Sequence, residues 1–142
     1  MNPIKKIVNR IAEKAGSGPG GKGLLDGKLR PCPNSPNCVS SVADQSTKRM
    51  EPIVFSGTPE EAISRLKKLL ASIDNAKIAE EDGGYIRAEF TTSLFGFIDD
   101  VEFLLDEKNR RIDFRSASRL GLSDLGTNRR RMKELKSRLE EN

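Results

Sequence analysis

The sequence predicts an α+β domain in which an antiparallel β-sheet carries two helices on one face, preceded by a separate amphipathic helix. Three observations favour this class. Residues 58–74 combine helical apolar spacing with helix-capping residues. Met132, Leu135 and Leu139 repeat at helical spacing near the C-terminus. Three stretches between them alternate apolar and polar side chains, as half-buried strands do: residues 85–92, 98–106 and 110–118. The expected order is strand, helix, four strands, helix.

Residues 3–15 predict the separate helix. Ile4, Ile7 and Ile11 lie at helical spacing, with lysines and arginines at positions between them. Such a helix can lie on an anionic membrane surface, or it can fold only against its own domain or a partner. The Gly-rich stretch that follows predicts a flexible linker. The predicted organisation is a basic helix at residues 1–15, a linker at residues 16–28 and a single α+β domain at residues 29–142.

Residues 31–38, with the sequence PCPNSPNC, predict an ordered loop that contains both cysteines of the chain. A disulfide between Cys32 and Cys38 would contribute roughly 2 kcal/mol by restricting the unfolded chain. A reducing cytosol would instead keep them as thiols, and thiols with a structural role are what we expect. Because the chain has no histidine, two cysteines supply at most half of a structural zinc site. We expect no metal and no cofactor.

The helix at residues 58–74 has the clearest signals in the chain. Thr58 is the predicted N-cap, Pro59 suits the first helical position, and Glu61 completes a capping box. Its predicted apolar face consists of Ala62, Ile63, Leu66, Leu69, Leu70 and Ile73. The remaining elements are less distinct: an extended or irregular stretch at 39–52, short strands at 53–55 and 76–82, and a tight turn at Gly83-Gly84.

The alternation also predicts how the strands pair. A two-residue turn at Glu107-Lys108 would place Val101 opposite Phe114 and Asp99 opposite Ser116. Matching the apolar faces across the preceding hairpin would place Thr92 opposite Asp99. The helix-covered face would therefore end in a polar row, Thr92–Asp99–Ser116. The final helix begins at the same end of the sheet.

A carboxylate that faces the core is costly unless it is paired, so Asp99 needs positive or hydrogen-bonding partners. Two interpretations stay open: an internal brace for the last helix, or a pocket for a small polar or anionic group. The candidate ligand-binding residues are Thr92, Asp99, Arg115, Ser116, Ser118, Arg119, Asp124, Asn128 and Arg131. Beside them, residues 94–97 form an apolar loop that is either a lid, a lipid-contacting tip or a cover for the core.

Three segments also carry a family resemblance. "CPNSPNCVSS", "FIDDVEF" and "RSASRLGLSDLGTNRRRMKEL" resemble, in this order, the hallmark segments of the domain-of-unknown-function family numbered 1499. The likeness covers about Leu29 to Leu139. It implies membership of a family of unassigned biochemistry, many of whose members resemble exported, lipoprotein or organelle proteins. This chain departs from those members in lacking an export signal.

Composition narrows the function classes. The absence of histidine excludes His-based triads and His general bases. A net charge of +4 permits contact with nucleic acid or anionic lipid without requiring either. We find no signal sequence and no apolar run that could span a bilayer. We therefore expect a cytoplasmic protein, or one peripheral to the inner face of the membrane.

The leading interpretation is a non-enzymatic binding or interaction module for an unknown small polar or anionic ligand. It could contact an anionic membrane through residues 3–15. One alternative is an enzyme on a small polar substrate that uses Asp99 as general acid or base. Another is nucleic-acid binding through the basic C-terminal stretch at 128–138, a partner we do not expect because no aromatic platform is interleaved there. We assign no catalytic residue.

Overall fold

The computed structural model describes residues 3, 21–93, 95–120 and 124–141. The predicted helix at 3–15 therefore lies, except for Pro3, outside the described residues. The strands are β1 (Leu24–Leu25), β2 (Lys28–Leu29), β3 (Cys38–Ser40), β4 (Ile53–Val54), β5 (Ala76–Asp82), β6 (Tyr85–Thr91), β7 (Ile98–Asp106) and β8 (Arg111–Ser118). The helices are α2 (Pro59–Ala71) and α3 (Thr127–Glu140). Neither of these two helices is long and apolar enough to cross a membrane.

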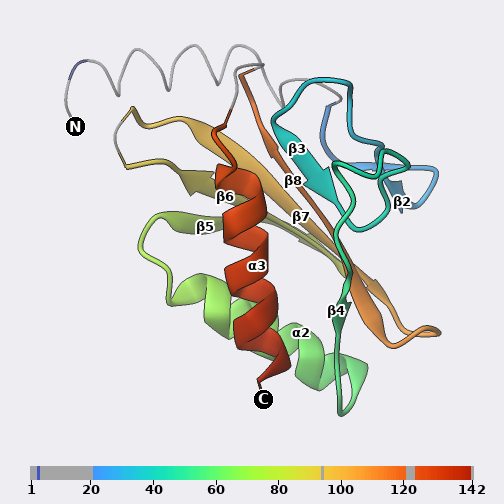
Figure 1. Cartoon of the computed structure of the whole chain (residues 1–142). Coiled ribbons are helices and arrows are strands. Elements are labelled where there is room, and N and C mark those ends of the chain that lie inside the picture. Colours follow the sequence, from blue (N-terminus) through green and yellow to red (C-terminus); the bar gives the residue numbers. More distant parts are fainter. Residues whose placement is uncertain (1–2, 4–20, 94, 121–123, 142) are drawn as a thin grey trace.

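The described chain is an α+β structure with antiparallel sheets, as predicted (Figure 1). The main sheet has the order β3-β8-β7-β6-β5, and β4 also pairs with β8. The helices α2 and α3 lie over one face of this sheet and close the core against it (Figure 1). Apolar side chains of β6, β7 and β8 meet those of the helices there: Ile86, Ala88, Val101, Phe103, Ile112, Phe114, Leu66, Leu70, Met132 and Leu135.

Two parts of the fold are more ordered than the sequence shows. The stretch at 39–52, predicted to be extended or irregular, begins within β3, which pairs with the end of β8. The range 16–28, predicted to be a linker, contains β1 and the first residue of β2, and these two strands form a small hairpin of their own. Both pairs of strands are short, and β3 pairs with a strand far along the chain. Local alternation of apolar and polar residues therefore does not predict β3.

The helix α2 forms as its capping residues predict. Thr58 Oγ1 accepts a hydrogen bond of 3.1 Å from the backbone N–H of Glu61, and Pro59 opens the first turn. Its predicted apolar face is also confirmed: Ala62, Leu66 and Leu70 are buried, and Ile63, Leu69 and Ile73 pack against the core.

The helix α3 begins differently, because its N-cap is Gly126, which has no side chain and a positive φ of 80°. The carboxylate of Asp124 takes over the capping. Its Oδ1 accepts from the N–H of Gly126 at 2.8 Å, and its Oδ2 accepts from the N–H of Asn128 at 3.2 Å. A carboxylate at this position also faces the positive end of the helix dipole. Asp124 therefore fixes both the start of α3 and the position of Asn128.

The predicted strand register is wrong by two residues in both hairpins. Asp99 lies opposite Phe90 on one side and opposite Ser118 on the other, and Val101 lies opposite Ser116. The turn between β7 and β8 contains four residues, 107–110, instead of two, and Arg110 adopts a positive φ of 54°. Because a shift of two preserves the alternation, Asp99 still faces the helices. The polar row Thr92–Asp99–Ser116 does not form.

Candidate functional site

A buried polar cluster lies between the sheet and α3. The carboxylate of Asp99 is 1% exposed, and its Oδ2 accepts a hydrogen bond of 2.7 Å from Nη2 of Arg131. The guanidinium carbon of Arg131 also lies 4.8 Å from the centre of the Phe90 ring, at cation–π distance. The other oxygen, Asp99 Oδ1, has no hydrogen-bond partner among the described residues. Arg131 is thus fixed from two sides by a strand carboxylate and an aromatic ring.

Asn128 is the centre of this cluster and is completely buried. Its Oδ1 accepts from Ser116 Oγ at 2.5 Å and from Arg131 Nη1 at 2.9 Å. Its Nδ2 donates to Asp124 Oδ2 at 2.7 Å and to Ser118 Oγ at 3.1 Å. Hydroxyls from β8 are therefore linked through one amide to both the cap and the first turns of α3. We call this the inner cluster: Asp99, Ser116, Ser118, Asp124, Asn128 and Arg131.

Three of the predicted site residues lie outside the inner cluster. Thr92 closes the loop between β6 and β7: its Oγ1 accepts from Phe97 N at 2.8 Å, and its own N–H donates to Phe97 O. Arg115 and Arg119 point to the opposite face of the sheet. Strand alternation itself gives this result, since both are out of phase with Ser116 and Ser118.

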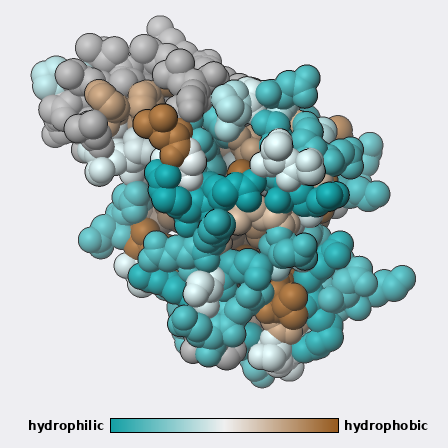
Figure 2. Space-filling view, viewed as in Figure 1, coloured by the Kyte–Doolittle hydropathy of each residue, from teal (hydrophilic) through white to brown (hydrophobic). Residues whose placement is uncertain are grey.

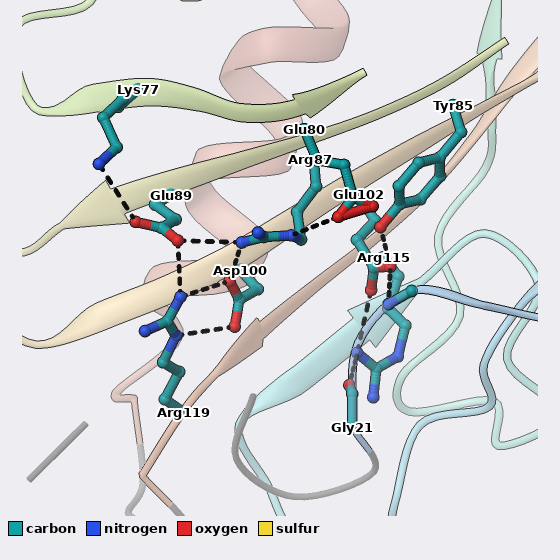
Figure 3. Close-up of polar contacts among 11 residues, drawn as sticks. Gly21, Lys77, Glu80, Tyr85, Arg87, Glu89, Asp100, Glu102, Arg115 and Arg119 are labelled. Carbon is teal, nitrogen blue, oxygen red and sulfur yellow. Dashed lines mark hydrogen bonds and ion pairs between the residues drawn. The ribbon is translucent and has the colours of Figure 1, made fainter. Parts of the chain in front are cut away.

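Arg119 belongs to an outer network of charges on the face without helices, centred on Arg87, Glu89, Asp100 and Arg119 (Figure 3). Its Nε donates to Asp100 Oδ2 at 3.0 Å and its Nη2 to Glu89 Oε2 at 2.8 Å. Arg87 Nη1 donates to the same two carboxylates, at 3.0 Å each. Burial alone would raise the pKa of Glu89, but the Arg87 hydrogen bond and the nearby cations outweigh it and lower that pKa. Two arginines and two acids thus balance each other across β6, β7 and β8.

Farther along the same face, Glu102 accepts from three donors (Figure 3). Tyr85 Oη donates to Oε2 at 2.7 Å, Gly23 N donates to Oε2 at 2.9 Å, and Arg115 Nη1 donates to Oε1 at 3.4 Å. Arg115 also donates to the carbonyl of Gly21 at 3.2 Å. Glu102 and Arg115 are completely buried. Together they attach the chain before β1 to the outer face of the sheet.

The two cysteines form a disulfide, which corrects the expectation of thiols. Cys38 pairs with Ala117 in the sheet, so the bridge anchors its loop at the end of β8. Asn37, which precedes Cys38 in that loop, contacts the inner cluster. Its carbonyl accepts hydrogen bonds from Ser118 N at 3.1 Å and from Asn128 Nδ2 at 3.3 Å. The cysteine loop therefore supports the site as well as the fold.

A groove of about 550 Å³ lies beside the inner cluster, between the end of α2 and α3. It is lined by Phe90 of β6, by Ser72, Ile73 and Asn75 after the end of α2, and by six residues of α3: Thr127, Arg130, Arg131, Glu134, Leu135 and Arg138. The molecular face that carries α3 is largely hydrophilic (Figure 2). Among the groove residues, Arg131 is the one that the inner cluster holds in place. Sequence spacing alone could not reveal the groove, because residues after α2 and in β6 contribute to it.

Most of the chain matches the model of a known protein family. Residues 28–139 match the model of a family described as a protein of unknown function, DUF1499. No curated protein and no solved structure matches the chain. The matched range includes the inner cluster, the outer network and the disulfide.

Proposed function

We propose that the chain, which belongs to the DUF1499 family of unassigned function, is a non-enzymatic binding module. The groove between α2 and α3 recognises a small anionic or polar group through Arg131 and Arg130. The observation that carries this proposal is the position of Arg131, at the groove wall and fixed by Asp99, Asn128 and Phe90.

Charge balance within the groove favours an anion. The charge of Arg131 is offset by Asp99, and that of Arg138 by Glu134 at 3.1 Å. Arg130 donates instead to two neutral oxygens, Leu125 O at 2.7 Å and Thr127 Oγ1 at 3.3 Å. It therefore contributes excess positive charge, in the first turn of α3, where the helix dipole adds to it. A guanidinium held in advance loses little conformational freedom when an anion binds.

The alternatives have less support. A general acid or base must reach its substrate, whereas Asp99 is 1% exposed and already holds Arg131. For nucleic-acid binding, the basic face of α3 is partly engaged, since Arg129 Nη2 donates to Thr47 O at 2.7 Å. Membrane contact through residues 3–15 stays a prediction, because all of them but Pro3 lie outside the described residues.

Titration of the full chain with inorganic phosphate and with citrate, followed by calorimetry and NMR, tests the proposal. We expect Arg130→Gln to weaken anion binding about tenfold, because a charged hydrogen bond contributes roughly 1.5–3 kcal/mol. Arg129→Gln is the matched control, since it removes the same charge from the neighbouring position outside the groove lining. Equal losses in the two variants, or no chemical-shift change at groove residues, would contradict the proposal.

A further inference from the structure

Two loops meet at the end of the sheet where α3 begins. One joins β6 to β7, and the other leaves β8 toward α3. Their proximity follows from the register, because Asp99 pairs with Ser118, and the N–H of Arg119 donates to the carbonyl of Ile98 at 3.1 Å. The groove opens near the same end, since Thr127 and Phe90 line it.

Each loop exposes a large apolar side chain. Phe95 is 45% exposed, with its ring 5.6 Å from that of Phe97, and Leu125 is 83% exposed. Loops between elements are usually polar, so the exposed apolar side chains of Phe95 and Leu125 stand out.

Leu125 also occupies an unfavourable backbone conformation. Its φ is 53°, in the left-handed region that glycine and asparagine adopt readily and that costs other residues roughly 1 kcal/mol. A leucine here neither suits the turn nor buries its side chain. The exposed apolar surface of this side chain is therefore available to an external contact.

Positive charge lies directly beside this tip. Arg130 Nη1 donates to the carbonyl of Leu125 at 2.7 Å, and both Arg130 and Lys133 are exposed. Exposed apolar side chains on two loops at one end of the sheet, next to cations, suit the interfacial layer of an anionic bilayer. A protein partner would more typically meet a continuous apolar patch around buried anchors.

We propose that this end of the sheet docks on an anionic lipid surface, with Phe95 and Leu125 inserted at the level of the headgroups and Arg130 on the lipid phosphates. This goes beyond the proposed function and shares only Arg130 with it.

Vesicle flotation with the full chain tests this inference. Wild-type protein should float with vesicles of phosphatidylcholine and phosphatidylglycerol, more than with phosphatidylcholine alone. The double variant Phe95→Ser/Leu125→Asn should bind at least about tenfold more weakly, because it removes the apolar side chains that insert. Asparagine tolerates the positive φ at position 125, so the variant keeps its turn. Val54→Ser is the control: Val54 is 61% exposed, on β4, which pairs with the opposite end of β8.

The outcomes separate this inference from the proposed function. Phosphate binding in solution should be unchanged in the double variant, because neither substituted residue lines the groove. If the double variant still floats like the wild type, or if Val54→Ser loses as much binding, the inference is wrong. If wild-type protein does not bind anionic vesicles but still binds phosphate, the inference fails while the proposed function stands. Vesicle binding without phosphate binding would support the inference and contradict the proposed function.

Discussion

Tyr85 is the only tyrosine in the chain, and it is 3% exposed with its phenol against Glu102. Burial raises the pKa of Tyr85 well above its ordinary value, and the hydrogen bond to Glu102 and the negative charges of Glu102 and Glu80 raise it further. The ionisation of Tyr85 therefore reports on the contacts of Glu102, without a signal from any other tyrosine. Since the chain also lacks tryptophan, its near-ultraviolet absorbance is simple to interpret.

The raised pKa predicts a specific alkaline behaviour. A group whose pKa is higher in the folded state contributes stability that is complete below its unfolded pKa, about 10 for tyrosine, and that is lost as the pH rises further. Phenolate absorbance should therefore appear together with unfolding, and not before it. Glu102→Gln should lower the pKa of Tyr85 but leave it above the ordinary value, because burial is the largest cause. A reversible titration near the ordinary value in folded protein would contradict the contact.

Among the elements, the strands show what a sequence can predict. Alternation correctly placed Asp99, Ser116 and Ser118 on the helix-covered face, because side-chain direction depends only on parity. It failed on register, because register depends on turn length, and residues 107–110 form a longer turn than the one assumed. Arg115 and Arg119 were grouped with the inner cluster because they are near it in sequence, although their parity places them on the outer face.

The helices and the cysteine loop also contain features that the sequence predicts and features that it does not. The start of α2 was predictable, because Thr58 and Pro59 act locally. The partner of Asp99 is harder to predict, since Arg119 and Arg131 both satisfy the requirement for a cation. Only the packing of α3 selects Arg131. The link from the cysteine loop to Asn128 was not predictable, because it depends on β3 pairing with a distant strand.

This link predicts that the disulfide stabilises more than its own loop. Reducing it, or replacing both Cys32 and Cys38 with serine, should lower the free energy of unfolding by roughly 2 kcal/mol through loop entropy. Because Asn37 is bonded to Ser118 and Asn128, amide hydrogen exchange at Ser118 should accelerate as well. Urea unfolding with and without reductant, combined with exchange mass spectrometry, measures both effects. Unchanged unfolding midpoints and exchange rates would show that the loop holds its position without the bridge.

At the scale of the whole molecule, the sheet carries buried charge on both faces. Helices cover the face of Asp99 and Arg131, and on the other face the segment around Gly21 and Gly23 contacts Glu102 and Arg115. Buried ion pairs contribute little net stability when they are complete, but leaving one member without its partners is costly. The N-terminal boundary of the folded unit therefore depends on which residues complete the hydrogen bonds of Glu102 and Arg115.

The family match begins at residue 28, yet Gly23 N donates to Glu102 and Gly21 O accepts from Arg115. A chain that begins at residue 28 removes both contacts, whereas one that begins at residue 20 retains them. We expect the shorter chain to be less stable by about 1–3 kcal/mol, the usual cost of leaving a buried polar group without its partner. The chain from residue 20 should retain the hydrogen bonds of both side chains. Urea unfolding of these two chains beside the full protein measures the difference. If the chain from residue 28 unfolds at the same midpoint as the chain from residue 20, water replaces the glycine contacts at no cost, and the folded unit begins at the family boundary.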